Sequence, residues 1–144
     1  MKFLAAAISL LPVLASAAEL RFEPAFDNAN GSLDTVACST GDNGIITRFG
    51  FQTFKDLPTF PNIGAADAIK NFNSPACGTC WNITFTDANQ TTTTITLTAI
   101  DVASSGFVVS QEAMDTLTGG QAVQLGLINV NATQVNATAC GLSE

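Results

Sequence analysis

Histidine and tyrosine are absent from this chain of 144 residues. Without histidine, the chain cannot form a Ser-His-Asp triad, a Cys-His nucleophile or a zinc site with imidazole ligands. Any acid–base chemistry must therefore use carboxylates. A zinc site made only of cysteines would usually need two Cys-x-x-Cys pairs, and the sequence contains one. We expect neither a metal ion nor a cofactor.

Positive charge is scarce as well. The chain has 5 basic residues against 12 acidic ones, which gives a formal net charge of −7. The basic residues are scattered along the chain, at Lys2, Arg21, Arg48, Lys55 and Lys70. Binding to a polyanion needs clustered lysine and arginine side chains. Nucleic acids and acidic membranes are therefore not expected as partners.

Long apolar runs are missing except at the N-terminus, where residues 1–18 have the pattern of a secretory signal peptide. Lys2 is followed by an apolar stretch from Phe3 to Leu14, which is too short to span a membrane, and by the small residues Ala15-Ser16-Ala17. A buried N-terminal helix is disfavoured, because a proline interrupts the stretch. Cleavage after residue 17 or after residue 18 fits equally well. Residues 19–144 then form one domain of a soluble, secreted protein.

Two of the four cysteines, Cys77 and Cys80, lie in the short stretch Ser74–Trp81, and the other two, Cys38 and Cys140, are distant. In an oxidising compartment four cysteines imply two disulfides, for which three pairings are possible. We favour the two pairings in which each cysteine of the central stretch has a distant partner. A redox site would place its thiolate at the start of a helix, whereas a strand is expected here.

Five Asn-x-Ser/Thr triplets agree with export, because such triplets accept N-linked glycans. They begin at Asn30, Asn82, Asn89, Asn131 and Asn136. Such triplets also arise by chance in a chain rich in threonine, so all five are candidates only.

Alternating side chains predict two neighbouring strands in the middle of the chain. Apolar and polar residues alternate from 81 to 86, and in a second strand at 92–99 Ile95, Leu97 and Ala99 alternate with threonines; a turn at 87–90 separates the two. The alternation makes Trp81 a core residue rather than a surface for stacking sugars. Continued, it would place Asp101 on the inward face. Either the second strand ends before Asp101, or this carboxylate enters a cleft or a hydrogen-bonded site.

The other predicted elements are shorter. Ser110 is a good N-cap for a helix that ends at Leu117, before two glycines. The remaining predictions are an extended segment at 20–26, a strand at 44–49, a helix at 63–72, alternation at 123–127 with a bend near Gly126, and a last strand toward Cys140. Several short strands, two short helices and cysteines that join distant segments indicate a small closed β-barrel with helices packed outside.

The chain resembles the cerato-platanin family of small secreted fungal proteins over most of its length. The matching segments are Gly31–Ser39, Leu57–Gly64, Ser74–Trp81, Ala99-Ile100-Asp101, Gly106-Phe107 and Ala132–Cys140. The resemblance implies a mainly β fold with two or three short helices, namely a six-stranded double-psi β-barrel like that of expansins. It also implies the disulfides Cys38–Cys77 and Cys80–Cys140.

The resemblance further implies location in the medium and in the fungal cell wall. Members of the family bind chitin oligomers and related wall polysaccharides in a shallow groove and act as elicitors, allergens or immune-active proteins. Expected partners are therefore wall polysaccharide and host immune receptors, for a monomer that could also self-assemble at surfaces. The alternative is an expansin-like, wall-loosening protein or a very weak glycosidase that uses Asp101.

The resemblance places carbohydrate binding at Asp101, Ser39, Asp42, Gly44 and Phe107. Glycosidic hydrolysis usually needs two carboxylates, and Asp42 is the only plausible partner for Asp101 as a candidate catalytic residue. We therefore expect no enzymatic activity. A structural role for Asp101, hydrogen-bonded to backbone amides, remains the competing interpretation. Val108 stands where the family usually has asparagine, which removes an amide that could bind sugar hydroxyls.

Overall fold

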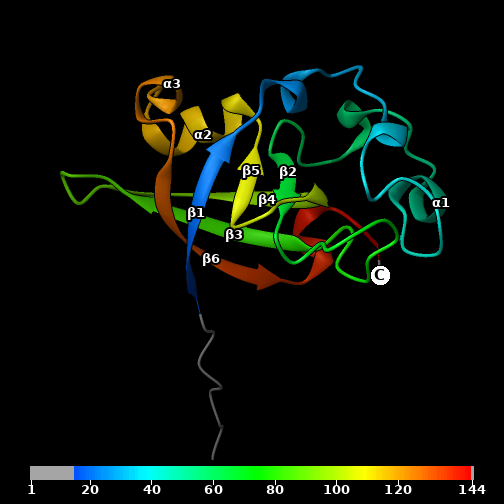
Figure 1. Ribbon diagram of the computed structural model, residues 1–144. Coiled ribbons are helices and arrows are strands. Elements are labelled where there is room, and N and C mark those ends of the chain that lie inside the picture. Colours follow the sequence, from blue (N-terminus) through cyan, green and yellow to red (C-terminus); the bar gives the residue numbers. More distant parts are fainter. Residues whose placement is uncertain (1–14, 144) are drawn as a thin grey trace, which may run out of the picture.

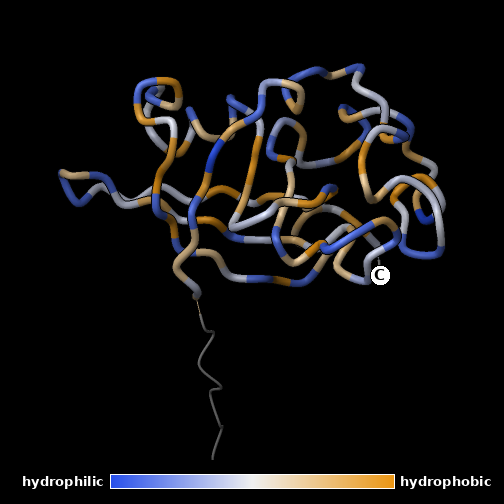
Figure 2. Tube along the Cα trace, viewed as in Figure 1, coloured by the Kyte–Doolittle hydropathy of each residue, from blue (hydrophilic) through white to orange (hydrophobic). Residues whose placement is uncertain are grey.

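Six strands close into a barrel in the computed structural model, which describes residues 15–143 (Figure 1). In chain order they are β1 (Ser16–Phe22), β2 (Ile63–Ala66), β3 (Cys80–Thr86), β4 (Thr92–Val102), β5 (Phe107–Val109) and β6 (Ile128–Val135). Around the barrel the order is β1-β5-β2-β4-β3-β6, and the β1–β5 and β2–β4 pairs are parallel. The barrel predicted from the sequence is confirmed. Figure 2 shows that β5 is hydrophobic along its length, which fits its place in the barrel wall.

Three α-helices lie outside the barrel: α1 (Ile45–Phe49), α2 (Gln111–Thr118) and α3 (Ala122–Leu125). Figure 1 shows α2 and α3 together on one side of the molecule and α1 on the other. Four 3-10 turns connect the elements, at Pro24–Asp27, Leu33–Thr35, Phe54–Asp56 and Ala137–Cys140. Most of the signal-peptide prediction, residues 1–14, lies outside the described residues. β1 already begins within that predicted segment, at Ser16.

The β3–β4 hairpin is the longest ladder of the barrel and follows the predicted alternation as far as Leu97, whereas Thr98, expected to face outward, is fully buried. Ile83, Ile95 and Leu97 are buried and belong to the main core. On the outer side, the hydroxyls of Thr84 and Thr94 lie 2.8 Å apart and share a hydrogen bond. Such cross-strand pairs add a few tenths of a kcal/mol each, up to about 1 kcal/mol, to a sheet.

Two disulfides join the loops to the barrel, as the family resemblance implied. Cys38 bonds to Cys77, with their Cα atoms 5.4 Å apart. Cys80, the first residue of β3, bonds to Cys140 near the end of the chain. The stretch from Cys77 to Cys80 therefore ties an early loop and the last 3-10 turn to the same edge of the barrel.

Two expected elements are wrong in type, and glycine explains the first. Residues 44–49 were expected as a strand but form α1. Gly44 is its N-cap, and Gly50 ends it in the left-handed conformation with φ of 73°, donating its N–H to Ile46 O. The helix is only five residues long, so its apolar spacing cannot be told from that of a strand.

Residues 63–72 were expected as a helix, but they form β2 followed by turns. All four residues of β2 are buried. A strand buried on both faces has no polar side, so its apolar run cannot be distinguished from a segment of buried helix by periodicity. Ile69 still enters the core, whereas Phe72 is 57% exposed instead of packing inward.

The segments before and after the hairpin also differ from expectation. The extended segment expected at 20–26 stops at Phe22, and a 3-10 turn starts at Pro24. The alternation at 123–127 belongs to α3, where Val123 and Leu125 are exposed rather than buried. The bend predicted near Gly126 is present, because this glycine caps α3 with φ of 67°.

Candidate functional site

Asp101 lies on β4 beyond a bulge. The strand therefore continues past Asp101, and the bulge explains why this carboxylate does not point into the core. Gly64 of β2 pairs with Ala99 and Ala65 pairs with Asp101, so Ile100 is an extra residue on β4. The bulge shifts the alternation by one residue. Ile100 is therefore fully buried, while Asp101 is half-buried at the surface.

One oxygen of Asp101 organises the neighbouring backbone. Its Oδ1 accepts hydrogen bonds from Ala37 N at 3.0 Å and from Val102 N at 2.9 Å. The other oxygen, Oδ2, makes no hydrogen bond within residues 15–143. The hydrogen-bonded site expected for this carboxylate is thus present, and one of its oxygens remains open to a ligand.

The loop of Ser39, Asp42 and Gly44 is fixed beside Asp101 by backbone hydrogen bonds. Cys38 N donates to Ile100 O, and Ser39 O accepts from the α1 residue Ile46. Ser39 is buried, and Gly44 caps α1, so both residues shape the loop. Asp42 lies at its exposed tip, and its carboxylate makes no hydrogen bond within the described chain.

Asn73 holds the other side of this loop. Its side-chain Oδ1 accepts from Asn43 N at 2.8 Å, and its backbone O accepts from Asn43 Nδ2 at 2.9 Å. Asn73 N donates to Ala37 O at 3.4 Å. Ala37 therefore joins Asn73 on one side to Asp101 on the other. The preceding residue, the exposed Phe72, belongs to the same surface.

We call the surface made by Asp101, Val102, Phe72, Asn73 and residues 37–44 the Asp101 face. Phe72 and Asn73 were not among the predicted site residues. The helical spacing of 63–72 placed Phe72 on an apolar side, and no pattern in the sequence signals its exposure. Asn73 has a φ of 59°. The only sequence signal for this turn is that asparagine tolerates positive φ better than most residues do.

Phe107 is buried in the core, and Trp81 packs against it from a half-buried position. Phe107 is 3% exposed, and its ring packs edge-on against that of Trp81, with 5.3 Å between centroids. Trp81 is half-buried, and its Nε1 donates to Thr79 Oγ1 at 2.9 Å. The structure therefore places Phe107 in the core, beneath the surface.

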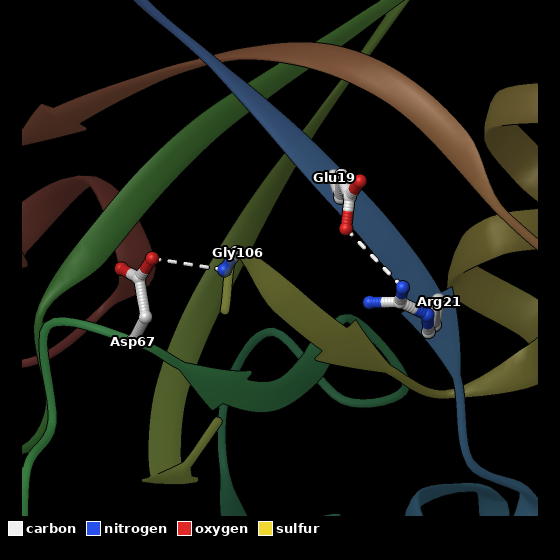
Figure 3. Close-up of polar contacts among 4 residues, drawn as sticks. All are labelled: Glu19, Arg21, Asp67 and Gly106. Atoms are coloured by element: carbon white, nitrogen blue, oxygen red, sulfur yellow. Dashed lines mark hydrogen bonds and ion pairs between the residues drawn. The ribbon is translucent and has the colours of Figure 1, made fainter. Parts of the chain in front are cut away.

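A second carboxylate that sequence reasoning missed, Asp67, follows β2. Because Ala65 pairs with Asp101, Asp67 leaves the barrel at the same end. Its Oδ2 accepts from Gly106 N at 2.8 Å, as Figure 3 shows. The nearby ion pair between Glu19 and Arg21 joins two exposed side chains of β1, with 3.2 Å between Oε2 and Arg21 Nη2 (Figure 3). The bond from Gly106 N to Asp67 therefore links the segment after β2 to the loop before β5, whereas the ion pair lies within one strand.

The described residues contain no group of three or more histidine, cysteine or acidic side chains arranged to hold a metal ion. The chemistry that the Asp101 face offers is therefore that of a carboxylate acceptor, backbone groups and an exposed aromatic ring. Within residues 15–143 there is also no helix with the length and hydrophobicity needed to cross a membrane.

Comparison with known proteins gives matches along nearly the whole chain. The sequence profile of the family described as Cerato-platanin matches residues 19–142. A heat-stable 19 kDa antigen of Coccidioides posadasii is 41% identical over 129 residues, which cover 90% of this chain and 84% of the antigen. Cerato-platanin of Ceratocystis fimbriata f. sp. platani is 35% identical over 135 residues, covering 92% and 94% of the two chains.

Solved structures agree with these matches. The crystal structure of cerato-platanin 2 from M. perniciosa has a TM-score of 0.84 and 54% identity, covering 88% of this chain and all of the other (100%). The solution structure of the fungal elicitor Cerato-Platanin has a TM-score of 0.72 and 33% identity, with coverage of 85% and 95%.

Proposed function

The chain belongs to the cerato-platanin family, and from this premise we propose that it is a secreted, immune-active fungal protein that binds cell-wall polysaccharide without hydrolysing it. Chitin oligomers and related glucans are the ligands, and the Asp101 face is the binding surface. The observation that carries the proposal is the hydrogen bonding of Asp101. Its Oδ1 is bonded to Ala37 N, Ala37 O accepts from Asn73 N next to the exposed Phe72, and Asp101 Oδ2 makes no hydrogen bond within residues 15–143.

A neutral sugar fits the chemistry of this face. The carboxylate can accept hydrogen bonds from sugar hydroxyls, and an aromatic ring offers an apolar surface to the face of a pyranose. Since the backbone bonds of Oδ1 already fix Asp101, its free oxygen is held in place before a ligand arrives, which reduces the entropy lost on binding. None of the residues that form the Asp101 face is basic, so an anionic ligand is disfavoured.

Binding without hydrolysis is supported by the positions of the two other carboxylates, Asp67 and Asp42. A glycosidase needs an acid and a second carboxylate on opposite sides of the scissile bond. Asp67 uses one oxygen to hold Gly106, and Asp42 lies on an exposed loop tip. Two disulfides and the signal-like segment at residues 1–18 support secretion. Recognition by a host immune receptor is a further part of the proposal, for which the names of the antigen and elicitor relatives are the support.

The proposal is tested by NMR titration of the protein with chitin oligomers. Amide signals of Asp101, Ser39–Gly44 and Phe72–Asn73 are expected to shift in a saturable way. Asp101→Asn and Phe72→Ala should each weaken binding about tenfold, the size of one lost charged hydrogen bond or one lost aromatic contact. Glu112→Gln and Val123→Ala are the matched controls, an exposed carboxylate and an exposed apolar residue on the helical side. Unchanged spectra at saturating oligomer would refute the proposal.

The non-catalytic part is tested separately, with the same oligomers and with cellulose. No reducing ends should be released over the background of a heat-inactivated sample. Release that disappears in Asp101→Asn, with the fold intact, would contradict this part and favour the weak-glycosidase alternative.

A further inference from the structure

A hollow of about 450 Å³ lies far from the Asp101 face, between the tip of the β3–β4 hairpin and the helices α2 and α3. Its lining residues are Phe85, Asp87, Ala88, Asn89, Thr118, Gln121 and Leu125. Figure 1 shows the hairpin tip reaching out on the side of α2 and α3. The hollow and Asp101 are at opposite ends of β4, about 30 Å apart for nine steps of extended chain.

The lining combines apolar surface with neutral polar groups. Phe85 is half-buried against the core, and Leu125 is 45% exposed. The side-chain amides of Asn89 and Gln121 make no hydrogen bond within residues 15–143. No lysine or arginine lines the hollow, so it does not suit an anion. Apolar surface beside unpaired amides suits a neutral sugar ring, which has an apolar face and hydroxyls at its edge.

Asn89 is both part of this hollow and the first residue of an Asn-Gln-Thr triplet. The turn that carries it is rigid. Asp87 Oδ1 accepts from Asn89 N at 2.8 Å and from Thr91 N at 2.9 Å, and Gln90 has φ of 63°. These bonds hold Asn89 in an exposed position at the rim of the hollow.

The side chains of three other triplet asparagines are occupied by the fold. Asn82 Oδ1, in the middle of β3, accepts from Thr96 Oγ1 at 3.1 Å. Asn136 Oδ1 caps the last 3-10 turn, and Asn30 Oδ1 accepts from Lys55 Nζ. Asn131 is exposed on β6 but does not line the hollow. Of the five triplet asparagines, Asn89 is the one that lines this hollow.

We propose that Asn89 carries an N-linked glycan whose first N-acetylglucosamine fills this hollow, with its apolar face on Phe85 and Leu125. The donor is a lipid-diphosphate oligosaccharide of the secretory pathway. Asn89 Nδ2 forms a bond to the sugar C1, the bond from C1 to the diphosphate oxygen breaks, the lipid diphosphate leaves and Nδ2 loses one proton. No oxidation or reduction occurs.

The glycan covers apolar surface that the fold leaves open and so stabilises the hairpin tip. This role is independent of polysaccharide binding at the Asp101 face, because the two sites share no residue.

The test uses protein secreted from yeast and an endoglycosidase that leaves one N-acetylglucosamine on each modified asparagine. Peptide mass mapping should find this sugar on Asn89. The trimmed protein should unfold about 3 °C above the Thr91→Ala variant, which keeps Asn89 but lacks the triplet. NMR should detect contacts between the sugar protons and the ring of Phe85. Asn131→Gln, which removes another exposed triplet, should leave both results unchanged.

Phe85→Leu separates packing from attachment. It keeps an apolar side chain at this position, and occupancy of Asn89 should persist while the thermal gain between the glycosylated and Thr91→Ala forms disappears. An unmodified Asn89 in the secreted protein would overturn the proposal. So would a modified Asn89 whose thermal gain is the same with phenylalanine and leucine at position 85. Binding of free chitobiose at Phe85 of a secreted protein with Asn89 unmodified would overturn it in favour of a polysaccharide site.

Discussion

Asp101 uses its two carboxylate oxygens for different tasks. Oδ1 joins β4 to the loop at Ala37, and Oδ2 makes no hydrogen bond within the described residues. The structural and the ligand-binding interpretations of this residue are therefore compatible. Substitutions that keep or remove the acceptor oxygen should separate the two roles.

Asp101→Ala should lower the free energy of unfolding by about 1–3 kcal/mol, because Ala37 N loses its acceptor in a half-buried position. Asp101→Asn keeps an acceptor oxygen and should cost less than about 1 kcal/mol. Urea unfolding measures both values. Equal losses in the two variants would contradict the structural role assigned to Oδ1.

The hydrogen bonds of Asp56 predict how the stability of the protein depends on pH. Its Oδ2 accepts from Gln52 N and from Thr53 N, each at 3.0 Å. These backbone bonds, that of Gln52 first, hold the pKa of Asp56 below its ordinary value of 3.8. The stabilisation is therefore complete above pH 3.8 and is lost as the pH falls through the lower, folded-state pKa.

We expect the stability difference between the wild type and Asp56→Asn to be constant near neutral pH and to shrink below about pH 4. Urea unfolding at several pH values gives this difference, and NMR titration of the carboxyl carbon gives the pKa directly. A carboxyl group that titrates at or above 3.8 would contradict the assignment.

At the scale of elements, α2 shows how a local signal and tertiary contacts act together. Ser110 is fully buried, its Oγ accepts from Ala113 N at 3.0 Å and donates to Pro61 O at 2.6 Å. Asp27 of the first 3-10 turn accepts from Gln111 N and Glu112 N. The serine cap was visible in the sequence, whereas the cap supplied by Asp27 comes from a segment more than eighty positions away.

Ser110→Ala should lower the free energy of unfolding by about 1–3 kcal/mol, since it removes a helix cap and leaves Pro61 O without its donor. Thr116→Ala, on the exposed side of the same helix, should stay within about 0.5 kcal/mol of the wild type. Thermal and urea unfolding report both. A loss in Ser110→Ala no greater than that in the control would show that the cap is dispensable.

The elements that were predicted wrongly are short. α1 has five residues, little more than one helical turn, and β2 has four, so each is too short for its periodicity to reveal its type. Their type is set by what covers them. β2 lies between β4 and β5 and is buried on both faces, and α1 is bounded by Gly44 and Gly50.

At the scale of the whole molecule, the two disulfides fix different segments of the chain. Cys38–Cys77 closes a separation of 39 residues and fixes the loop that borders Asp101. Cys80–Cys140 closes 60 residues and fixes the last turn against β3. Loops of these lengths predict a stabilisation of about 4 kcal/mol from each bond, mainly through the unfolded chain.

Replacing either pair by alanines should therefore lower the free energy of unfolding by about 4 kcal/mol. Only the loss of Cys38–Cys77 should also weaken binding of chitin oligomers, because Cys38 lies between Ala37 and Ser39 on the Asp101 face. Binding measured at low temperature, where both variants are folded, distinguishes them. Equal binding by both variants would show that the loop held by Cys38–Cys77 is not part of the ligand site.

The sequence by itself determined the hairpin, the cap of α2, the closed barrel and the disulfide bonding of all four cysteines. These features depend on local alternation, on side chains that bond to the nearest backbone and on the scarcity of polar residues at inward positions. The pairing of the cysteines came from the resemblance to a family, since spacing alone allowed two arrangements.

Tertiary structure alone decided the bulge at Ile100, the exposure of Phe72 and the hollow beside Asn89. Each of these features depends on segments that are distant in the chain. The bulge results from the register between β2 and β4, and the Asp101 face from hydrogen bonds that join Asp101, Ala37 and Asn73. The hollow results from the approach of α2 and α3 to the hairpin tip. Periodicity reports only which neighbours along the chain share a face, so it carries no information about these contacts.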